Sequence, residues 1–282
     1  MSDERFRFGA NWLRFLEVVD EVRIGAAVQS LQAMLGVVRL DGQRFLDVGC
    51  GSGLFSLAAH RLGATVHSLD YDPQSVACTR EMQRRFSQSE NAWTIEPGSA
   101  RDAEYLSTLP LSDVVYSWGV LHHTGEMWRA IDLVSQRVSP GGLLFLSIYN
   151  DQGQISDRWK LIKRLHQRLP RPLNTGLVAA IGVMFLLQRC GAALVSFVLR
   201  LVTLRNPLTP ITTLVHDLRA SDGRGMHRWY DLVDWVGGWP FEVATPEAIF
   251  DFLRDRGFRL RVLKTCGGGL GCNEFVFVRE LD

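Results

Sequence analysis

Apolar runs separated by helix-length segments recur along much of the chain. The segments 45–48, 65–70 and 113–118 have the length of strands, and 143–150 carries no charge, which is typical of a strand covered on both faces. Strands that alternate with helices usually join one parallel sheet. We therefore predict an α/β fold with a doubly wound, mostly parallel sheet.

The end of the chain predicts a different pairing. Thr245 and Pro246 are typical of an N-cap and a first helical residue, and the helix is expected to end near Gly257. Two strands are expected at 258–264 and 274–279, joined by a glycine-rich turn. Since short connections join antiparallel strands, the sheet is expected to end in an antiparallel hairpin.

Glycines stand at alternate positions in the turn after the first strand. Gly49, Gly51 and Gly53 form G-x-G-x-G, whereas a dinucleotide site has G-x-G-x-x-G. Asp70 ends the next strand, where a carboxylate can accept hydrogen bonds from both hydroxyls of a ribose. Asp47 is placed to orient the turn or to meet an ammonium group. A nucleoside that carries an amino acid suits this arrangement, and an NAD site or a purely structural turn is the alternative.

The segments 45–53 and 65–70 resemble motifs I and II of the class I S-adenosylmethionine (SAM)-dependent methyltransferases. The resemblance implies SAM as the cofactor, the family's seven-stranded sheet, and a cofactor site that includes the aspartates and glycines named above. It covers roughly residues 40–150 and 245–281. The nearest general likeness is to the ubiquinone-pathway type of O-methyltransferase.

The same resemblance implies further cofactor contacts. Tyr71 is expected to lie against the edge of the adenine. Residues 97–102 correspond to the segment that faces the adenine in the family, which places Ser99 and Ala100 at the cofactor. Because Ser99 stands where many relatives carry Asp, we expect Asp102 to contact the adenine amino group, with a helix N-cap as its competing role.

The segment 113–123 is expected to contain the fourth strand and the loop at its carboxyl end, where open α/β sheets bind ligands. In the family this loop lies between SAM and the acceptor, which places Trp118 at the cofactor. His123 stands where relatives often have His or Glu, and at a near-neutral pKa it could take a proton from an acceptor hydroxyl. The alternative is that His123 caps or packs under the following helix, and His122 is the weaker candidate.

Residues between the fifth strand and the last helix are expected to form a mainly helical insertion. We expect an N-terminal helical cap at 1–40, a SAM-binding core at 41–150, the insertion at 151–244 and the C-terminal part of the core at 245–282. Elaborations at this point usually form the substrate side of the cleft. The partly apolar insertion is therefore expected to act as a lid or to select the acceptor.

The first half of the insertion is both basic and apolar. Residues 158–169 place apolar side chains on one helical face and cations on the rest. The stretches 177–187 and 190–199 are apolar, but a Gln-Arg pair at 188–189 separates them, and an Arg inside a spanning helix costs ~2.5–3.5 kcal/mol. We expect two short helices, packed as a hairpin or lying in the membrane interface, with peripheral membrane contact through 158–205. A buried lid or a homodimer interface is the alternative.

The second half of the insertion mixes aromatics, acids and histidines around glycines, as is typical of a loop that closes over a substrate. His227 and Asp231 are its catalytic candidates. His216 and His227 lack H-x-x-x-H or H-x-H spacing, so no metal site is expected. The turn 266–273 has neither the lysine of a P-loop nor the spacing of a zinc knuckle, and is expected near the substrate mouth.

Charge and cysteine content bear on partners and location. Lys and Arg number 31 against 30 Asp and Glu, so no overall basic field argues for nucleic acid. The first dozen residues lack the apolar core of a signal peptide, and the five cysteines show no C-x-x-C spacing. We expect free thiols and a cytoplasmic protein, peripheral on the inner face of the membrane.

The expected function is methyl transfer from SAM to a small, lipophilic acceptor, with a hydroxyl on a quinone- or phenol-like head favoured. Two alternatives stay open, because the motifs specify the cofactor and not the bond that breaks. One is a SAM-dependent enzyme of non-methyl chemistry. The other is a non-catalytic, membrane-associated SAM-binding protein.

Overall fold

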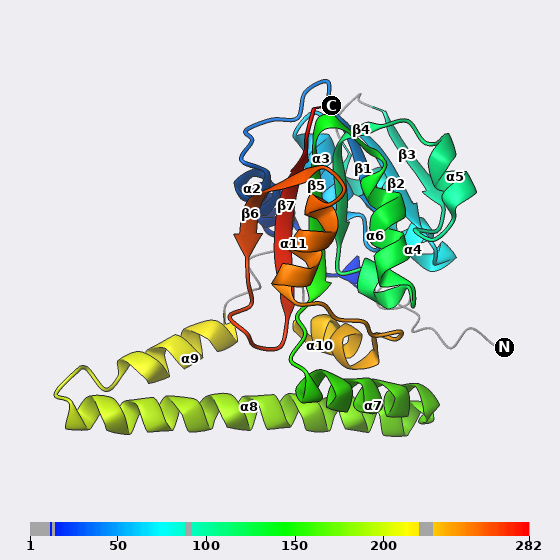
Figure 1. Ribbon diagram of the computed structural model, residues 1–282. Coiled ribbons are helices and arrows are strands. Elements are labelled where there is room, and N and C mark those ends of the chain that lie inside the picture. Colours follow the sequence, from blue (N-terminus) through cyan, green and yellow to red (C-terminus); the bar gives the residue numbers. More distant parts are fainter. Residues whose placement is uncertain (1–11, 13–14, 88–91, 220–227, 282) are drawn as a thin grey trace.

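A seven-stranded sheet lies at the centre of the computed structural model, which describes residues 12, 15–87, 92–219 and 228–281. Its strand order is β3-β2-β1-β4-β5-β7-β6 (Figure 1). The strands are β1 (Arg44–Val48), β2 (Thr65–Asp70), β3 (Trp93–Pro97), β4 (Ser112–Trp118), β5 (Val138–Tyr149), β6 (Phe258–Lys264) and β7 (Cys272–Arg279). Strands β1 to β5 pair in parallel, whereas β7 runs antiparallel to both β5 and β6. The predicted sheet with its terminal hairpin is confirmed.

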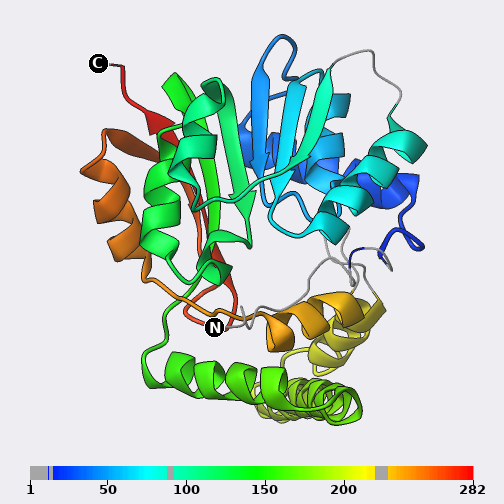
Figure 2. The ribbon, with the colours of Figure 1, turned by 90° about the vertical axis from the view of Figure 1, so that its right-hand side faces the viewer.

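Helices cover both faces of the sheet (Figure 2). One face carries α2 (Glu21–Leu35), α3 (Leu54–Arg61) and α4 (Pro73–Phe86), and the other carries α5 (Ala103–Thr108), α6 (Met127–Ser135) and α11 (Pro246–Arg254). Successive residues of a strand point to opposite faces, so Phe45 joins the first apolar core and Leu46 the second. Both faces of the central strands are therefore buried, as their apolar sequence predicts.

The insertion forms a separate layer at the edge of the sheet where β5 ends (Figures 1 and 2). It contains α7 (Gln154–Arg168), α8 (Arg171–Val202), α9 (Thr209–Arg219) and α10 (Arg228–Gly237). A third apolar core holds it together, made of Trp159, Val178, Ile181, Val236 and Phe241. Because the carboxyl ends of parallel strands face this layer, the insertion lies where ligands bind in such sheets.

Helix α8 runs without a break through Gln188 and Arg189, so the prediction of two short helices is wrong here. Both residues have good helix propensity and both are exposed, so neither interrupts the helix. By length and composition α8 is long and apolar enough to cross a membrane. Helix α9 packs against it, so the helical hairpin forms one element later than predicted.

Candidate functional site

A cavity of about 930 Å³ opens at the carboxyl ends of the parallel strands. Its walls come from the turn after β1, the end of β2, the loops after β3 and β4, the turn between β6 and β7, and the insertion. Ligand pockets commonly measure about 300–1,000 Å³. The cavity is therefore large enough for a nucleoside and a small acceptor together.

The glycine turn brings bare backbone to the cavity wall. Gly49 and Gly51 line the cavity, and both have positive φ. A Cβ on Gly49 would lie only 2.4 Å from Cγ1 of Val120, so no larger residue fits there. Gly53, which was predicted to bind the cofactor, is instead the N-cap residue of α3 and stands behind the turn, outside the residues found to line the cavity.

Asp70 presents an oriented carboxylate at the cavity wall. The N–H of Gly51 donates to one of its oxygens at 3.0 Å, and the N–H of Asp72 donates to the other at 2.8 Å. Burial raises its pKa to about 6. The backbone N–H of Tyr71 donates to the same carboxylate. The group lies at the cavity wall, where a carboxylate can accept hydrogen bonds from ribose hydroxyls.

Asp47 lies beneath the glycine turn and is only 2% exposed. The Ser56 hydroxyl donates to its carboxylate at 2.5 Å, and the Ser68 hydroxyl donates to Ser56 at 2.7 Å. Burial raises the pKa of Asp47 to about 7, and the neighbouring charge of Asp70 acts in the same direction. A cationic group in the cavity would favour its charged form, as an amino-acid ammonium would do.

Tyr71, Ser99 and Ala100, which were predicted to contact the cofactor, also line the cavity. Asp102 takes a different role. Its carboxylate accepts the N–H of Tyr105 at 3.0 Å and caps α5, and it is not among the described residues that line the cavity. The first turn of a helix needs such an acceptor, so the structure replaces the predicted adenine contact of Asp102 with the N-cap role.

His123 ends the short helix η1 (Leu121–His123) and lines the cavity. A carbonyl oxygen only accepts, so Nδ1 must donate in its 2.6 Å contact with Pro240 O, which leaves the ring lone pair on Nε2. Burial, and then the cation of Lys163, lower the pKa of His123 to about 3. The near-neutral pKa expected from the sequence is therefore wrong, because sequence does not reveal burial.

His122 is fully buried behind its neighbour. Its Nδ1 accepts the N–H of Tyr149 at 3.4 Å, and the two rings lie 3.9 Å apart between centroids. Burial lowers the pKa of His122 as well. The residue supports the loop and is not among the described cavity-lining residues.

Aromatic side chains complete the cavity on the side of His123. Trp118, Tyr149, Trp235 and Trp239 all line it. The Tyr149 and Trp235 rings meet edge to face with centroids 4.7 Å apart. Of these four, sequence reasoning selected only Trp118, although the clustering of aromatics around α10 was a visible signal for the two insertion tryptophans.

Glu274 is a cavity-lining carboxylate that sequence reasoning missed. It is buried in β7, accepts the indole N–H of Trp118 at 2.8 Å and lies 3.4 Å from Nζ of Lys264. Lys264 is its direct partner in the β6–β7 register. In the sequence, Glu274 directly precedes the apolar run 275–278. This placement was a visible signal, because core strands rarely carry a carboxylate.

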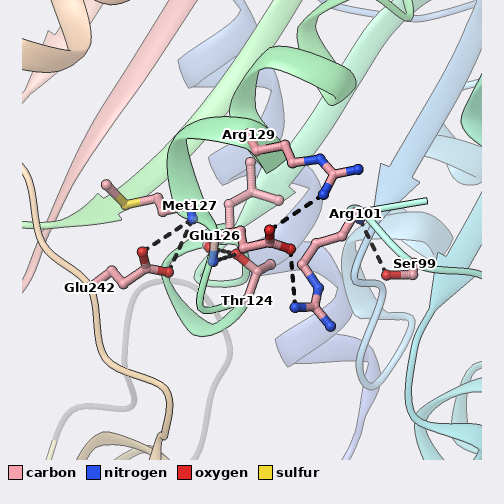
Figure 3. A network of polar contacts seen from close by, with 8 residues as sticks. Ser99, Arg101, Thr124, Glu126, Met127, Arg129 and Glu242 are labelled. Atoms are coloured by element: carbon pink, nitrogen blue, oxygen red, sulfur yellow. Dashed lines mark hydrogen bonds and ion pairs between the residues drawn. The ribbon is translucent and has the colours of Figure 1, made fainter. Parts of the chain in front are cut away.

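A polar network ties the insertion to the loop after β4 (Figure 3). The Glu242 carboxylate accepts the N–H of Met127 at 3.1 and 3.2 Å, at the start of α6. Glu126 pairs with Arg101 at 3.2 Å and with Arg129 at 3.3 Å. The network holds the segment whose Pro240 carbonyl orients His123.

Two predicted catalytic residues cannot be placed in the site. His227 lies outside the described residues. Asp231 belongs to α10, but its side chain is also outside the description. Both stay predictions.

Comparison with known proteins gives a matching family model and several similar proteins. A family model described as "Methyltransferase domain" matches residues 20–176, just over half of the chain. Ribosomal protein L11 methyltransferase of Methylococcus capsulatus is 33% identical over 114 residues, which are 40% of this chain and 36% of that protein. Ubiquinone biosynthesis O-methyltransferase of Salmonella enteritidis is 32% identical over 117 residues, 41% of this chain and 46% of that protein. The chain thus matches less than half the length of these curated relatives.

A solved structure shares the fold over most of its length. Magnesium protoporphyrin IX methyltransferase of Synechocystis, determined with bound S-adenosylhomocysteine, aligns with a TM-score of 0.50 and 17% identity over 93% of this chain and 89% of that one. At this identity the likeness shows the fold alone. Since the family model covers more than half of the chain and the sheet has the family's strand order, the protein belongs to the class I SAM-dependent methyltransferases, with SAM as its cofactor.

Proposed function

We propose that the protein transfers a methyl group from SAM to a hydroxyl oxygen on a small, lipophilic acceptor with a quinone- or phenol-like head. One observation carries this proposal: Asp70 and the aromatic residues around His123 line the same cavity. Flat aromatic walls favour a ring-shaped acceptor. The similarity to proteins named ubiquinone biosynthesis O-methyltransferase supports the same class of acceptor.

At the cofactor end, bound SAM supplies an electrophilic methyl group on its sulfonium. In our proposal Asp70 accepts hydrogen bonds from the ribose hydroxyls, and Tyr71, Ser99 and Ala100 surround the adenine. The backbone at Gly49 and Gly51 approaches the methionine part. The charged form of Asp47, disfavoured by burial, is restored beside the ammonium group.

At the acceptor end, His123 Nε2 receives the hydroxyl proton. With a pKa of about 3 the imidazole is too weak a base to deprotonate a free phenol, whose pKa is about 10. Once the oxygen forms its new bond to carbon, it becomes positively charged and its proton is strongly acidic. His123 therefore works late, and until then it orients the hydroxyl by accepting its hydrogen bond.

The experiment is incubation of the protein with methyl-labelled SAM and a total lipid and metabolite extract. We expect S-adenosylhomocysteine and one labelled lipophilic species, both strongly reduced by His123→Gln. Consumption of SAM without S-adenosylhomocysteine would indicate non-methyl chemistry. SAM binding without turnover on any fraction would favour the non-catalytic alternative.

We also propose a cytoplasmic location. The cysteines of the described residues form no disulfide with one another, which is usual in a reducing compartment. Fractionation of the source cells should place the protein on the cytoplasmic side. Recovery from an oxidising compartment with its cysteines paired would contradict this.

A further inference from the structure

The outward side of α8 is an extended apolar surface. Of its 32 residues, all of them described, Val178 and Ile181 are buried, and they pack into the core of the insertion. We define the apolar face of α8 by five exposed side chains at spacings of four, seven, four and three residues: Val183, Leu187, Leu194, Val198 and Leu201. At 100° per residue these spacings fall on one side of the helix, opposite Val178 and Ile181.

The charged residues of α8 lie on a different side. Arg171 and Arg189 are eighteen residues apart, which is five whole turns, and Arg200 follows eleven residues later, close to three turns. All three therefore form one row, which runs along a flank of the helix next to its buried side. Arg189 and Arg200 border a shallow groove against α9. The apolar face itself contains no charge.

The charge of this region differs from that of the rest of the chain. Residues 158–205 hold nine Lys or Arg and no Asp or Glu, so the remaining chain has 22 Lys or Arg and 30 Asp or Glu. One of the nine, Lys163, is buried; the others include Arg158, Arg164 and Arg168 on α7, which lies beside α8 (Figure 2). A net charge of only +1 thus conceals a basic side and an acidic remainder.

We propose that the apolar face of α8 docks in the plane of an anionic lipid bilayer, with the arginine row at the level of the headgroups. An apolar face flanked by cations is the pattern of interfacial helices, whose Arg side chains extend to the headgroups. The charge complementarity favours this occupant over a second copy of the chain, because symmetric pairing through the same face would bring two basic regions together.

The helix lies on the bilayer and does not cross it. Its first half is fixed to the domain through Val178 and Ile181, and α9 packs back along its second half. The segments that precede and follow α8 therefore both pack back toward the protein. A membrane-spanning orientation would need both packings to separate and would place Arg189 in the hydrocarbon.

The docking face adjoins the acceptor end of the cavity. Helix α10, which carries the cavity-lining Trp235, packs against both α7 and α8. Docking would therefore hold the acceptor side of the cavity next to the lipid. This last step rests on the proposed lipophilic acceptor, whereas the docking itself rests on α8 alone.

The test is co-sedimentation of the full-length protein with vesicles of phosphatidylcholine, alone or with about 30 mol% phosphatidylglycerol. We expect binding to the anionic vesicles that weakens with added salt, and a loss of at least tenfold in Leu187→Glu/Leu194→Glu. The matched control is Val22→Glu/Val38→Glu, which makes the same charge change at side chains 77% and 79% exposed on or just after α2, outside the insertion. The control should bind as the wild type does.

Circular dichroism and SAM calorimetry on both double variants would verify that each is folded with an intact cofactor site. Equal binding by the α8 variant, or no binding of the wild type to anionic vesicles, would overturn the proposal. So would sedimentation as a dimer that only the α8 variant abolishes. Vesicle binding without methyl transfer would leave docking in place and refute the proposed function instead.

Discussion

Asp70 makes SAM binding dependent on pH. Its pKa is about 6 in the free protein, and a ribose diol can hydrogen-bond well only to the charged carboxylate. The charged fraction is about 91% at pH 7 and about 9% at pH 5. Since affinity scales with the competent fraction, the titration of Asp70 alone should weaken SAM binding about tenfold from pH 7 to pH 5. The α-amino group of SAM stays cationic across this window, because such groups titrate at about 7.7–8.0.

The assay is calorimetry of SAM at several pH values on wild type and two variants. Asp70→Asn should bind about 10²- to 10⁴-fold more weakly, since two charge-assisted hydrogen bonds at ~1.5–3 kcal/mol each are lost. Its remaining affinity should keep only the pH dependence that Asp47 contributes through the ammonium group. Asp47→Asn removes the second group that titrates in this range, so this variant should show the tenfold change that Asp70 causes. A flat wild-type profile, or an affinity that does not vary with pH in Asp47→Asn, would refute the ribose assignment.

Three further predictions concern single side chains. His123→Gln should lower kcat by about 10²- to 10⁴-fold with little change in SAM affinity. Because the pKa of His123 is about 3, its titration should not lower the wild-type kcat at saturating SAM between pH 7 and 5. A fully active variant would exclude His123 as the proton acceptor. Lys163→Met should raise the pKa of His123, followed by NMR of the imidazole; an unchanged pKa would show that the cation does not reach it. Gly53→Ala should lower the free energy of unfolding in urea by about 1–3 kcal/mol, because φ is 79° and the new Cβ would lie 2.8 Å from Thr79. Gly25→Ala, inside α2 with nothing within 4 Å of the new Cβ, should raise it by about 0.5–1 kcal/mol. Equal effects of the two substitutions would refute the steric argument.

The core of the fold could be predicted because its signals are local. The glycine turn, Asp70 and the terminal hairpin each follow from a few adjacent residues, and their place in the sheet follows from the handedness and order of α/β connections. Asp102 shows the limit of this reasoning. Its two roles were both compatible with the sequence, and only the first turn of α5 decides for the N-cap.

Properties that depend on distant residues could not be predicted. The pKa of His123 depends on burial under a segment more than one hundred residues away and on Lys163. Glu274 joins the cavity through a partner 156 positions earlier, Trp118. The continuity of α8 could not be predicted for another reason. A Gln-Arg pair is costly inside a membrane and therefore favours a break, whereas this helix lies outside the sheet domain with both side chains exposed.

The insertion belongs to the chemistry of the site as much as to the surface. Lys163 of α7 is fully buried, donates to the carbonyl of Trp235 and lies 4.6 Å from the centre of that ring, which forms part of the cavity wall. Two residues away on either side, Leu161 and Leu165 are exposed. One helix thus holds a cavity wall and tunes His123 on its inner face while its outer face meets the surroundings. A displacement of α7 on docking would therefore change the position of Trp235 and the pKa of His123 together. A membrane-binding helix joined to the domain only by a flexible linker could change neither.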